Sequence, residues 1–470
     1  MFARSQIAVA AAAAIGLLTL VAQAQAATHF SNFTPLAASA GPIVIGSAGE
    51  ATPVTLSSVN FSQKSIADRA TQNALVPGSN SGSWDMVTAN ETGADAGRYL
   101  FMPFETGTAG VQRVDLWDNN YNTRTVTIVA PGTKSFVSGD ASRWTPWGSY
   151  LTAEESWGTG STRGRLFEVS NATTAAANGG NFIQRSIIPR VSHEGLAFDN
   201  AKSMYFIDEL NGGSIYKYTS ANANAANGDD YFAKGQTFVA KVNGGNNANA
   251  VGGLTWEAIT DVNGAALAGV STVLADGTID GRASADTVKG TDYQRPEDMD
   301  VNTLANGDQV MLVATTTTNE VYSFNLTTNQ VSVFANQNTI DLATGVAVGA
   351  ALLSPDNIAV DADGNVYIVE DRNGGVDNDI WFARDLNKDG DLLDAGEGLA
   401  RWASNGTQGS EFTGLYFDKF NANKAYVNIQ HPSSGVDRLI EISAVPEPST
   451  YAMLLGGLGL MGFVARRRKA

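Results

Sequence analysis

Two stretches of the chain, HEGLAFDNAKSMYFIDELNGGSIYKY (residues 193–218) and PDNIAVDADGNVYIVEDRNGGVDNDIWFA (residues 355–383), share one pattern of hydrophobic alternation and turn residues. Each reads as a strand, a turn, a second strand ending in two acidic residues, a glycine-containing turn and a third strand. A sheet unit of this kind cannot bury its apolar faces alone, so repeated copies are expected to pack on one another. We therefore interpret the two stretches as blades of one β-propeller.

Four further units of the same kind begin at Trp84, Thr145, Pro296 and Glu411. Residues 27–444 contain no long amphipathic helix, so the fold class is all-β, and six units predict a propeller of about six blades closed by radial repetition. A two-sheet sandwich is the alternative, but six units would overfill it. The repeat lapses between residues 219 and 290, where long Asn/Gly-rich loops are expected; LTWEAI and VSTVLADGTI there are read as outer strands or a small insertion.

Both ends of the chain carry processing patterns. Arg4, an apolar run over residues 7–21 and small residues up to Ala26 are typical of a signal peptide, so residues 1–26 are expected to be removed on export. At the other end, residues 445–470 read VPEPSTYAMLLGGLGLMGFVARRRKA: a Pro-Glu-Pro triplet, an apolar segment and a basic tail.

This C-terminal pattern resembles the PEP-CTERM sorting signal of exported bacterial proteins. The resemblance implies that the apolar segment holds the chain transiently in the inner membrane, and that a sorting and processing protease then releases it to the cell surface or the medium. The apolar run is short for a permanent span of roughly 20 residues, and the basic tail would stay cytoplasmic. An ordinary C-terminal anchor is the alternative.

The amino-acid composition limits the classes of partner that this chain can bind. The chain has 30 basic and 47 acidic residues, a net charge of −17, which repels nucleic acid and anionic membranes and favours cations. There is no cysteine, so neither a disulfide nor a thiolate metal site can form. Nucleic acid is not expected as a partner of this chain.

The repeat places acidic residues at one end of every blade. In an antiparallel pair, the start of the first strand and the end of the second lie at the same edge of the sheet, so these positions should face one mouth of the propeller. First strands begin at Glu194, Glu297, Asp356 and Glu411. Second strands end in pairs, which are Glu154 and Glu155, Asp208 and Glu209, Glu370 and Asp371, and Gln430 and His431.

So many carboxylates at one mouth would repel one another, and bound cations are the simplest way to make them tolerable. Oxygen ligands with few histidines favour Ca²⁺ or Mg²⁺, with manganese or iron also possible. The alternative is that these acids cap turns and remain solvated.

A separate stretch, DLNKDGDLLDAGE over residues 385–397, is typical of a calcium loop. Oxygen-bearing side chains alternate before Gly390, which permits the tight turn. The predicted structural calcium ligands are Asp385, Asn387, Asp389, Asp391, Asp394 and Glu397. A plain Asx turn is the alternative.

The ordered set TPWGSYLTAEE, HEGLAFD, RPEDMDV, SPDNIAVDADGNVYI and FTGLYFDKFNANKAYVNIQHP, between Thr145 and Pro432, resembles the alkaline phosphatases of the PhoX family. The resemblance implies a β-propeller with calcium and iron ions at its mouth that hydrolyses phosphate monoesters outside the cytoplasm. Carried over by position, it implies Arg295 as the phosphate-binding residue. It implies as metal ligands Glu154, Glu155, Glu194 and Glu297, and, further along the mouth, Asp208 and Glu209.

One position departs from the family. Where members read Thr-Cys-Glu-Glu, with the cysteine bridging two irons, this chain has Ala153, which offers no ligand atom. A family-type di-iron centre is therefore not expected, and a retained site would hold calcium or magnesium.

Two functions follow. The first is an exported, metal-dependent phosphomonoesterase, because phosphoryl transfer needs charge stabilisation more than thiolate chemistry. The second is a non-catalytic, calcium-loaded propeller that binds extracellular polysaccharide or protein. Lactone or diester hydrolysis on the same scaffold remains a third possibility. Asp356, Glu370, Asp371 and His431 are expected as further residues of the mouth.

Overall fold

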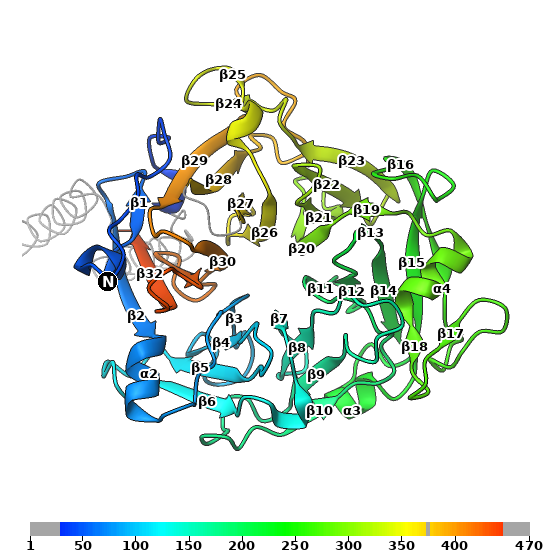
Figure 1. The fold of residues 1–470 in the computed structure, drawn as a ribbon. Helices are drawn as coiled ribbons and strands as arrows, with labels where there is room; N and C mark the ends of the chain where they lie inside the picture. The colour runs from blue at the N-terminus through cyan, green and yellow to red at the C-terminus, as the bar shows by residue number, and fades with distance from the viewer. Residues whose placement is uncertain (1–28, 373–376, 445–470) are drawn as a thin grey trace, which may run out of the picture.

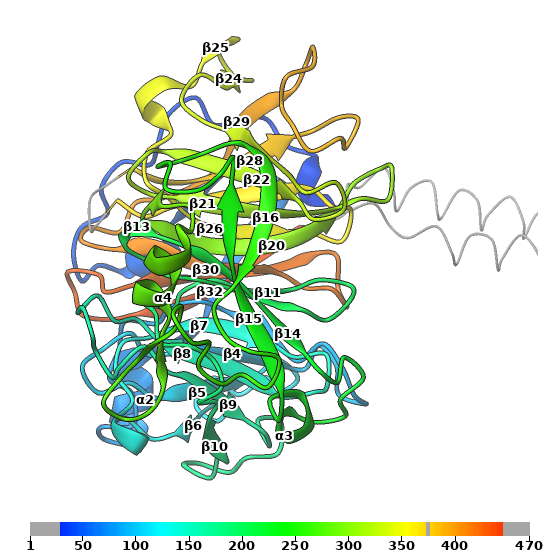
Figure 2. The same ribbon diagram turned by 90° about the vertical axis from the view of Figure 1, so that its right-hand side faces the viewer.

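The repeated units of the sequence form six β-sheet blades around a central axis in the computed structural model, which describes residues 29–372 and 377–444 (Figure 1). The predicted all-β propeller is therefore confirmed. Figure 2 shows the ring from its side, with the blades stacked about the axis. We number the blades in chain order of their innermost strands.

The first three blades occupy the middle of the chain. The first blade contains β3 (Thr88–Ala89), β4 (Tyr99–Pro103), β5 (Val111–Asp115) and β6 (Thr125–Val129). The second blade contains β7 (Gly139–Trp144), β8 (Tyr150–Glu154), β9 (Leu166–Val169) and β10 (Phe182–Gln184). The third blade contains β11 (Leu196–Phe198), β12 (Met204–Ile207), β14 (Ile215–Ser220) and β15 (Gly235–Val242).

The remaining blades complete the ring. The fourth blade contains β20 (Pro296–Thr303), β21 (Gln309–Thr315), β22 (Glu320–Asn325) and β23 (Gln330–Ala335). The fifth contains β26 (Pro355–Val360), β27 (Val366–Glu370), β28 (Asn378–Arg384) and β29 (Gly398–Asn405). The sixth contains β30 (Glu411–Phe417), β31 (Lys424–Gln430), β32 (Arg438–Ala444) and β2 (Phe61–Asp68).

The sixth blade closes the ring with strands from both ends of the described chain. Its outer strand β2 pairs antiparallel with β32 from Phe61 opposite Ala444 to Asp68 opposite Arg438. In Figure 1 the two strands lie side by side, one blue and one red. The sequence repeat did not reveal this closure, because β2 lies outside the six repeated units, before the first of them.

The segment between the third and fourth blades contains both kinds of structure that the sequence left open. LTWEAI lies largely in β16 (Gly252–Ala258), an outer strand that pairs with β15 and, through two residues, with β23. VSTVLADGTI forms the hairpin of β17 (Thr272–Val273) and β18 (Ile279–Asp280), which leads into α4 (Gly281–Val288). A further ladder joins β13 (Asn211–Gly213) to β19 (Tyr293–Gln294).

Short strands and helices lie outside the six four-stranded blades. Two small strands pair with β29, and they are β1 (Val54–Leu56) and β24 (Ile340–Asp341); β25 (Val346–Ala347) pairs with β24. The remaining helices are α2 (Arg69–Leu75), α3 (Gly228–Tyr231), η1 (His29–Ser31), η2 (Ala48–Ala51), η3 (Thr133–Ser135) and η4 (Gly349–Ala351). In the described ranges no helix is long and apolar enough to cross a membrane. The expected signal peptide and the apolar C-terminal segment lie outside these ranges.

Apolar side chains of neighbouring blades pack face to face, which buries the inner strands on both sides. Every residue of β4, β8 and β27 is buried. Between the fifth and sixth blades, for example, the Tyr367 ring lies tilted against Phe417, with ring centres 4.3 Å apart, and within the fifth blade it lies edge-on to Trp402. This packing holds the inner strand ends in fixed positions around the axis.

Candidate metal centre

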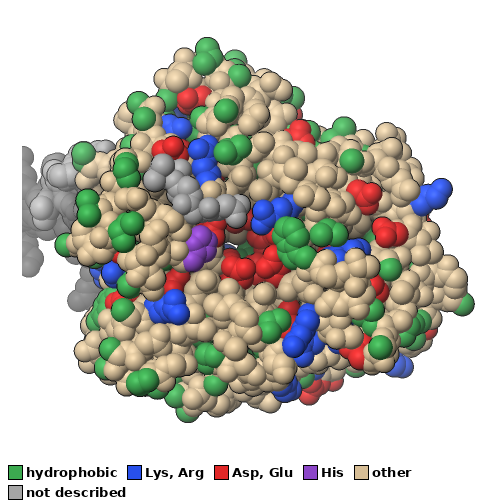
Figure 3. Space-filling view, in the orientation of Figure 1, with side chains coloured by type: hydrophobic (Ala, Val, Ile, Leu, Met, Phe, Trp, Pro, Cys, Tyr) green, Lys and Arg blue, Asp and Glu red, His purple; other side chains and the backbone are tan. Residues whose placement is uncertain are grey.

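The inner strand ends surround a cavity of about 360 Å³ at one mouth of the propeller. Figure 3 shows acidic side chains gathered in the central opening of this face. Ten carboxylates line the cavity, and they are Asp85, Glu105, Asp140, Glu155, Glu194, Glu209, Glu297, Asp356, Asp371 and Glu411. Arg295 and His431 also line this cavity. The predicted convergence of strand-end acids at one mouth is therefore what the structure shows.

Irregular strand pairing accompanies three of these acids. In β7, β20 and β26 the register shift spans the acidic residue, whereas in β30 it lies beyond Thr413 and Glu411 pairs regularly with Gln430. In β20, for example, Pro296 pairs with Thr315, and regular pairing resumes only at Met299. A bulge re-aims the side chains beside it, so Glu297 reaches the cavity rather than the space between blades.

Three of the carboxylates form a compact group. Ligand oxygens of Glu194, Glu209 and Glu297 lie within 4.8 Å of one another, and all three side chains are buried. We call these residues the carboxylate triad. The buried Oε2 of Glu194 receives no hydrogen bond from any described residue, and the same holds for Oδ1 of Asp140 and Oε2 of Glu411. Unsatisfied carboxylate oxygens facing one cavity are suited to a cation.

Burial and mutual repulsion disfavour the ionised form of these acids. Burial, with repulsion from Glu297 and Asp356, raises the pKa of Glu194 well above its ordinary value. Burial, with the charges of Glu297 and Glu155, does the same to the pKa of Glu209. Burial also raises the pKa of Asp85 to about 8. Near neutral pH the metal-free cavity must therefore retain several protons, which a cation would displace.

Arg295 is held beside the carboxylate triad by backbone pairing. The β13–β19 ladder ends at Gln294, and the Arg295 amide donates to the carbonyl of Leu210 at 3.1 Å. Arg295 has a left-handed backbone, with φ of 57°. Its Nε lies 2.9 Å from Glu209 Oε1 and 2.9 Å from Glu297 Oε1. Neither terminal nitrogen of the guanidinium donates to a described residue, so both remain available to an anion.

Trp157 covers the guanidinium from the solvent side. The Arg295 Cζ lies 5.3 Å from the centre of the indole ring, and the indole Nε1 donates to Glu209 Oε2 at 3.1 Å and also to Glu155. Trp157 is 44% exposed and lies against these residues at the rim of the mouth.

Three predicted residues of the mouth lie elsewhere. Glu154, Asp208 and Glu370 are fully buried inside the blades and do not line the cavity. Glu154 accepts from Arg165, and Asp208 accepts from both Nε and Nη2 of Arg282 on α4. Strand alternation sends one acid of each pair into the blade and its neighbour to the axis. The placement therefore corrects the expectation that both acids of a pair face the mouth.

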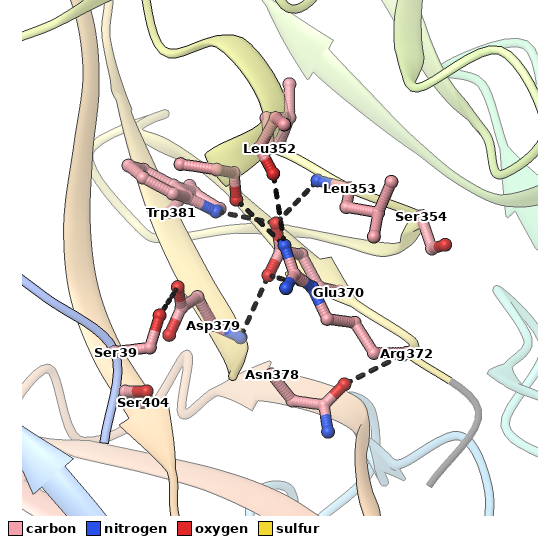
Figure 4. A network of polar contacts seen from close by, with 12 residues as sticks. Ser39, Leu352, Leu353, Ser354, Glu370, Arg372, Asn378, Asp379, Trp381 and Ser404 are labelled. Carbon is pink, nitrogen blue, oxygen red and sulfur yellow. Dashed lines mark hydrogen bonds and ion pairs between the residues drawn. The ribbon is translucent and has the colours of Figure 1, made fainter. Parts of the chain in front are cut away.

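Glu370 shows what such an embedded acid does (Figure 4). Its carboxylate accepts from the Leu353 amide at 2.8 Å, the Trp381 indole at 3.0 Å and the Asp379 amide at 3.1 Å. Glu154 accepts similarly from the Val137 amide, and Asp208 from the Ser192 amide. In these three blades the embedded acid thus fixes the backbone a few residues before the cavity acid of the first strand. We call Glu154, Asp208 and Glu370 the embedded acids.

Asp85, Glu105 and Asp140 are cavity residues that the sequence interpretation missed. Asp85 and Glu105 belong to the unit that begins at Trp84, and the positional rule would have found them there. Asp140 was missed because the second unit was taken to begin at Thr145, one strand too late; its first strand is β7.

The remaining predictions concern other positions. Asp356, Asp371 and His431 line the cavity, as predicted.

The six predicted calcium ligands lie in the loop between β28 and β29. In this loop Asp385 accepts a hydrogen bond from the Gly390 amide at 3.0 Å, and Glu397 accepts one from the Leu386 amide at 2.8 Å. Asn387 bridges Asp389 and Asp394 through its side-chain amide. The loop therefore brings these six residues together, with calcium still a prediction.

The donor set decides which ions fit the cavity. It consists of carboxylates, with His431 as the one nitrogen ligand on its wall. Hard cations such as Ca²⁺ and Mg²⁺ fit such a set. A thiolate-bridged di-iron centre does not, because the sequence contains no cysteine and Ala153 is buried in the apolar core.

Comparisons with known proteins agree with this site and fold. A family model described as alkaline phosphatase PhoX matches residues 140–433, and a model of the PEP-CTERM protein-sorting motif matches residues 444–469. A search of curated proteins gives no match.

Solved structures add the fold. PhoX of Pseudomonas fluorescens, in complex with the transition-state analogue vanadate, is similar with a TM-score of 0.61 and 14% identity, over 88% of this chain and 98% of that chain. A Bacteroides thetaiotaomicron protein of unknown function gives a TM-score of 0.42 and 13% identity, over 82% and 76% of the two chains. Since the family model spans more than half of the sequence, the chain belongs to the PhoX family of alkaline phosphatases and carries a PEP-CTERM sorting motif.

Proposed function

We propose that this protein is an exported, metal-dependent phosphatase that hydrolyses phosphate monoesters in the cavity at the propeller mouth. The observation that carries the proposal is the carboxylate triad, three buried carboxylates within 4.8 Å of one another, in direct contact with a guanidinium whose terminal nitrogens face no described acceptor. A site lined by carboxylates alone would bind only cations. A site in which carboxylates hold a cation next to an arginine can bind a phosphate between the cation and the guanidinium.

Each residue has a distinct task in this proposal. Glu194, Glu209 and Glu297 would hold a hard cation, which when bound supplies positive charge to polarise the ester and stabilise the transition state. Arg295 would bind two phosphate oxygens through its planar fork, as guanidinium groups do. Glu209 and Glu297 fix the orientation of that fork through Nε. Trp157 shields the ion pairs from water, which strengthens them.

Export and a second ion belong to the same proposal. The PEP-CTERM motif indicates sorting for export and implies a protease that acts on the C-terminal tail. Calcium in the loop of residues 385–397 would be structural, because that loop lies between β28 and β29 and its residues do not line the cavity.

The absent bridging thiolate favours a second candidate, a calcium-loaded propeller that binds extracellular polysaccharide without catalysis. Ala153 is fully buried among apolar side chains and offers no ligand. The two candidates differ in one measurable property, which is turnover.

The test pairs elemental analysis with an activity assay on purified protein spanning residues 27–444. We expect several bound metal ions per chain and turnover of an aryl phosphate with added calcium or magnesium. The Arg295→Ala variant should retain its metal and lose turnover by roughly 10²–10³-fold. The matched control is Arg113→Ala, whose guanidinium donates to backbone carbonyls of Ala172 and Thr173 away from the cavity. Bound calcium with no turnover in the wild type would leave the binding propeller instead.

A further inference from the structure

The outer part of the third blade carries a groove of about 420 Å³, separate from the cavity at the mouth. It lies over β14, β15 and β16, which Figure 2 shows on the side of the ring that faces the viewer. Five side chains of these strands line it, and they are Lys217, Thr219, Gln236, Phe238 and Trp256. The volume falls within the range of roughly 300–1,000 Å³ that is usual for sites that bind small ligands.

Strand register brings these five side chains to one face of the blade. Lys217 pairs with Phe238 and Thr219 pairs with Gln236 across β14 and β15. Residues opposite each other in an antiparallel ladder point to the same side of the sheet, as do residues two apart on one strand. Trp256 joins this side because it pairs with the residue two places after Phe238. The groove therefore has a regular sheet as its floor.

The fourth blade covers the inner part of this face. The Trp256 ring packs on a buried cluster shared with β21 and β22, and its centre lies 5.7 Å from that of the Tyr205 ring. Phe238 and Lys217, further out, are half-buried and line the groove together with the remaining surface of Trp256. Aromatic surface on a fixed support is thus open to a ligand.

Lys217 gives this groove a positive charge. It is the one charged side chain among the described residues that line the groove. Its Nζ lies 5.7 Å from the centre of the Trp256 ring and 5.8 Å from that of Tyr205, and no carboxylate in the described ranges forms an ion pair with it. On the opposite face of β15, by contrast, Lys241 has Glu257 at 3.8 Å. The Lys217 ammonium is therefore available to an anion.

Polar groups beside the aromatic floor retain capacity for hydrogen bonds. The Gln236 amide nitrogen donates to the carbonyl oxygen of Thr260 at 2.9 Å, which orients the side chain. The amide oxygen of Gln236 receives no hydrogen bond from a described residue, and the exposed hydroxyl of Thr219 has no partner among them either. An acceptor, a hydroxyl and an ammonium thus surround the aromatic surface.

A sugar ring that carries a carboxylate matches this arrangement. Its C–H face packs on an aromatic ring, and its hydroxyls exchange hydrogen bonds with an amide and a hydroxyl. Its carboxylate meets the ammonium, and a charge-assisted hydrogen bond is roughly twice as strong as a neutral one. The net charge of −17 repels distant anions, but salt at physiological strength screens such repulsion beyond about 8 Å.

We propose that this groove binds a uronic acid unit of an acidic polysaccharide. The groove is remote from the mouth: β14 begins at Ile215, which pairs with Ile207 at the cavity end of β12, whereas Thr219 lies near the other end of β14. A polymer held there leaves the mouth open. The inference therefore does not rest on the proposed phosphatase function.

The test is calorimetric titration of the purified protein with tetragalacturonate and with its carboxyl-reduced, neutral counterpart. Chelator is present, so that no calcium bridges the uronate to surface carboxylates. We expect one tetragalacturonate per chain, and roughly tenfold weaker binding of the neutral tetramer, because a hydrogen bond to a charged group is lost. Lys217→Gln should weaken tetragalacturonate by the same factor, and Lys217→Arg should retain its binding. The matched control is Lys241→Gln, which removes a lysine from the opposite face of the same blade.

The aromatic floor is tested separately. Trp256→Ala should weaken both tetramers by roughly 30-fold, the effect of a buried aromatic anchor. Because Trp256 also packs on the fourth blade, thermal unfolding must show that this variant is folded. Phe238→Ala, at the more open part of the groove, is the second variant and should weaken both tetramers to a smaller extent.

Several results would overturn the proposal. They are no binding of tetragalacturonate by the wild type, equal binding of the acidic and neutral tetramers, or an equal loss in Lys217→Gln and Lys241→Gln. Equally tight binding of tetraglutamate would also overturn it, because the groove would then respond to charge alone. Phosphatase turnover should be the same in Lys217→Gln as in the wild type, and a wild type without turnover would leave this inference unchanged.

Discussion

The cavity acids and the embedded acids are neighbours in sequence but have opposite environments. Glu155, Glu209 and Asp371 line the cavity, whereas Glu154, Asp208 and Glu370 lie one residue earlier and are buried in the blades. The embedded acids accept hydrogen bonds from backbone amides, and two of them have a close arginine partner. The triad acids crowd one another around a single guanidinium. The embedded acids support the fold, whereas the crowded triad keeps an oxygen of Glu194 that receives no hydrogen bond from a described residue and can bind a ligand.

The largest expected effect concerns the cavity side of this comparison. Glu209→Gln keeps the size of the side chain but removes a cation ligand, so we expect loss of one metal ion and a roughly 10²–10³-fold loss of phosphatase turnover. The metal-free variant should stay close to the wild type in stability, because relief of the repulsion from Glu297 and Glu155 offsets the lost pairing with Arg295, which keeps Glu297 as a partner. Metal analysis, a turnover assay and thermal unfolding measure the three quantities. A marked loss of stability would mean that Glu209 is structural.

The neighbouring substitution should have the converse effect. Asp208→Asn leaves the Arg282 guanidinium buried without its carboxylate, and breaking a buried ion pair costs about 3 kcal/mol of unfolding free energy. Metal stoichiometry at saturating metal should not change. Urea unfolding of the variant and of Glu209→Gln, side by side, checks this. If Asp208→Asn loses metal but not stability, the division into the two classes is wrong.

The pH dependence of stability sharpens the comparison further. Burial raises the pKa of Asp85 from 3.8 to about 8. A carboxyl group with a higher pKa in the folded state binds protons more tightly there, so its stabilising contribution is present at low pH and is lost as the pH rises through this window. We expect metal-free protein to lose on the order of 1 kcal/mol of stability per pH unit.

Thermal unfolding between pH 4 and 8, with chelator or with added calcium, measures this loss. Bound calcium should flatten the curve, because the cation replaces the protons. Asp85→Asn should reduce the slope in chelator. A flat curve without metal would mean that burial does not raise the pKa of Asp85.

The smallest effect is expected at the loop of residues 385–397. Asp389→Asn should lower the calcium content by one ion and the unfolding temperature by a few degrees, with phosphatase turnover unchanged, because the loop is remote from the cavity. Asp308→Asn, in an exposed turn between β20 and β21, is the control. Equal calcium content in the wild type and the variant would leave the loop as an Asx turn.

The sequence contained enough information to predict the propeller and the convergence of acids, because both depend on a pattern repeated in six units. It did not contain the choice between neighbouring acids. That choice depends on the side of the strand on which each acid falls and on arginines that the fold brings in, such as Arg282, which lies 74 residues after Asp208 on an inserted helix. The positional rule did bring Glu411 and His431 to one edge of the sixth blade, but it did not show that the Gly409 carbonyl, in the turn before β30, contacts the imidazole.

The pairing of β2 with β32 determines when the propeller ring can close during synthesis of the chain. The strand that completes the ring is among the first to be synthesised, and its partner is the last described strand before the sorting motif. The ring therefore cannot close until the whole domain has been made, and the cavity acids from six separate units cannot gather earlier. A chain that has not yet closed its ring has no assembled cavity, so a variant truncated before β32 should lack the cation affinity that the proposed function requires.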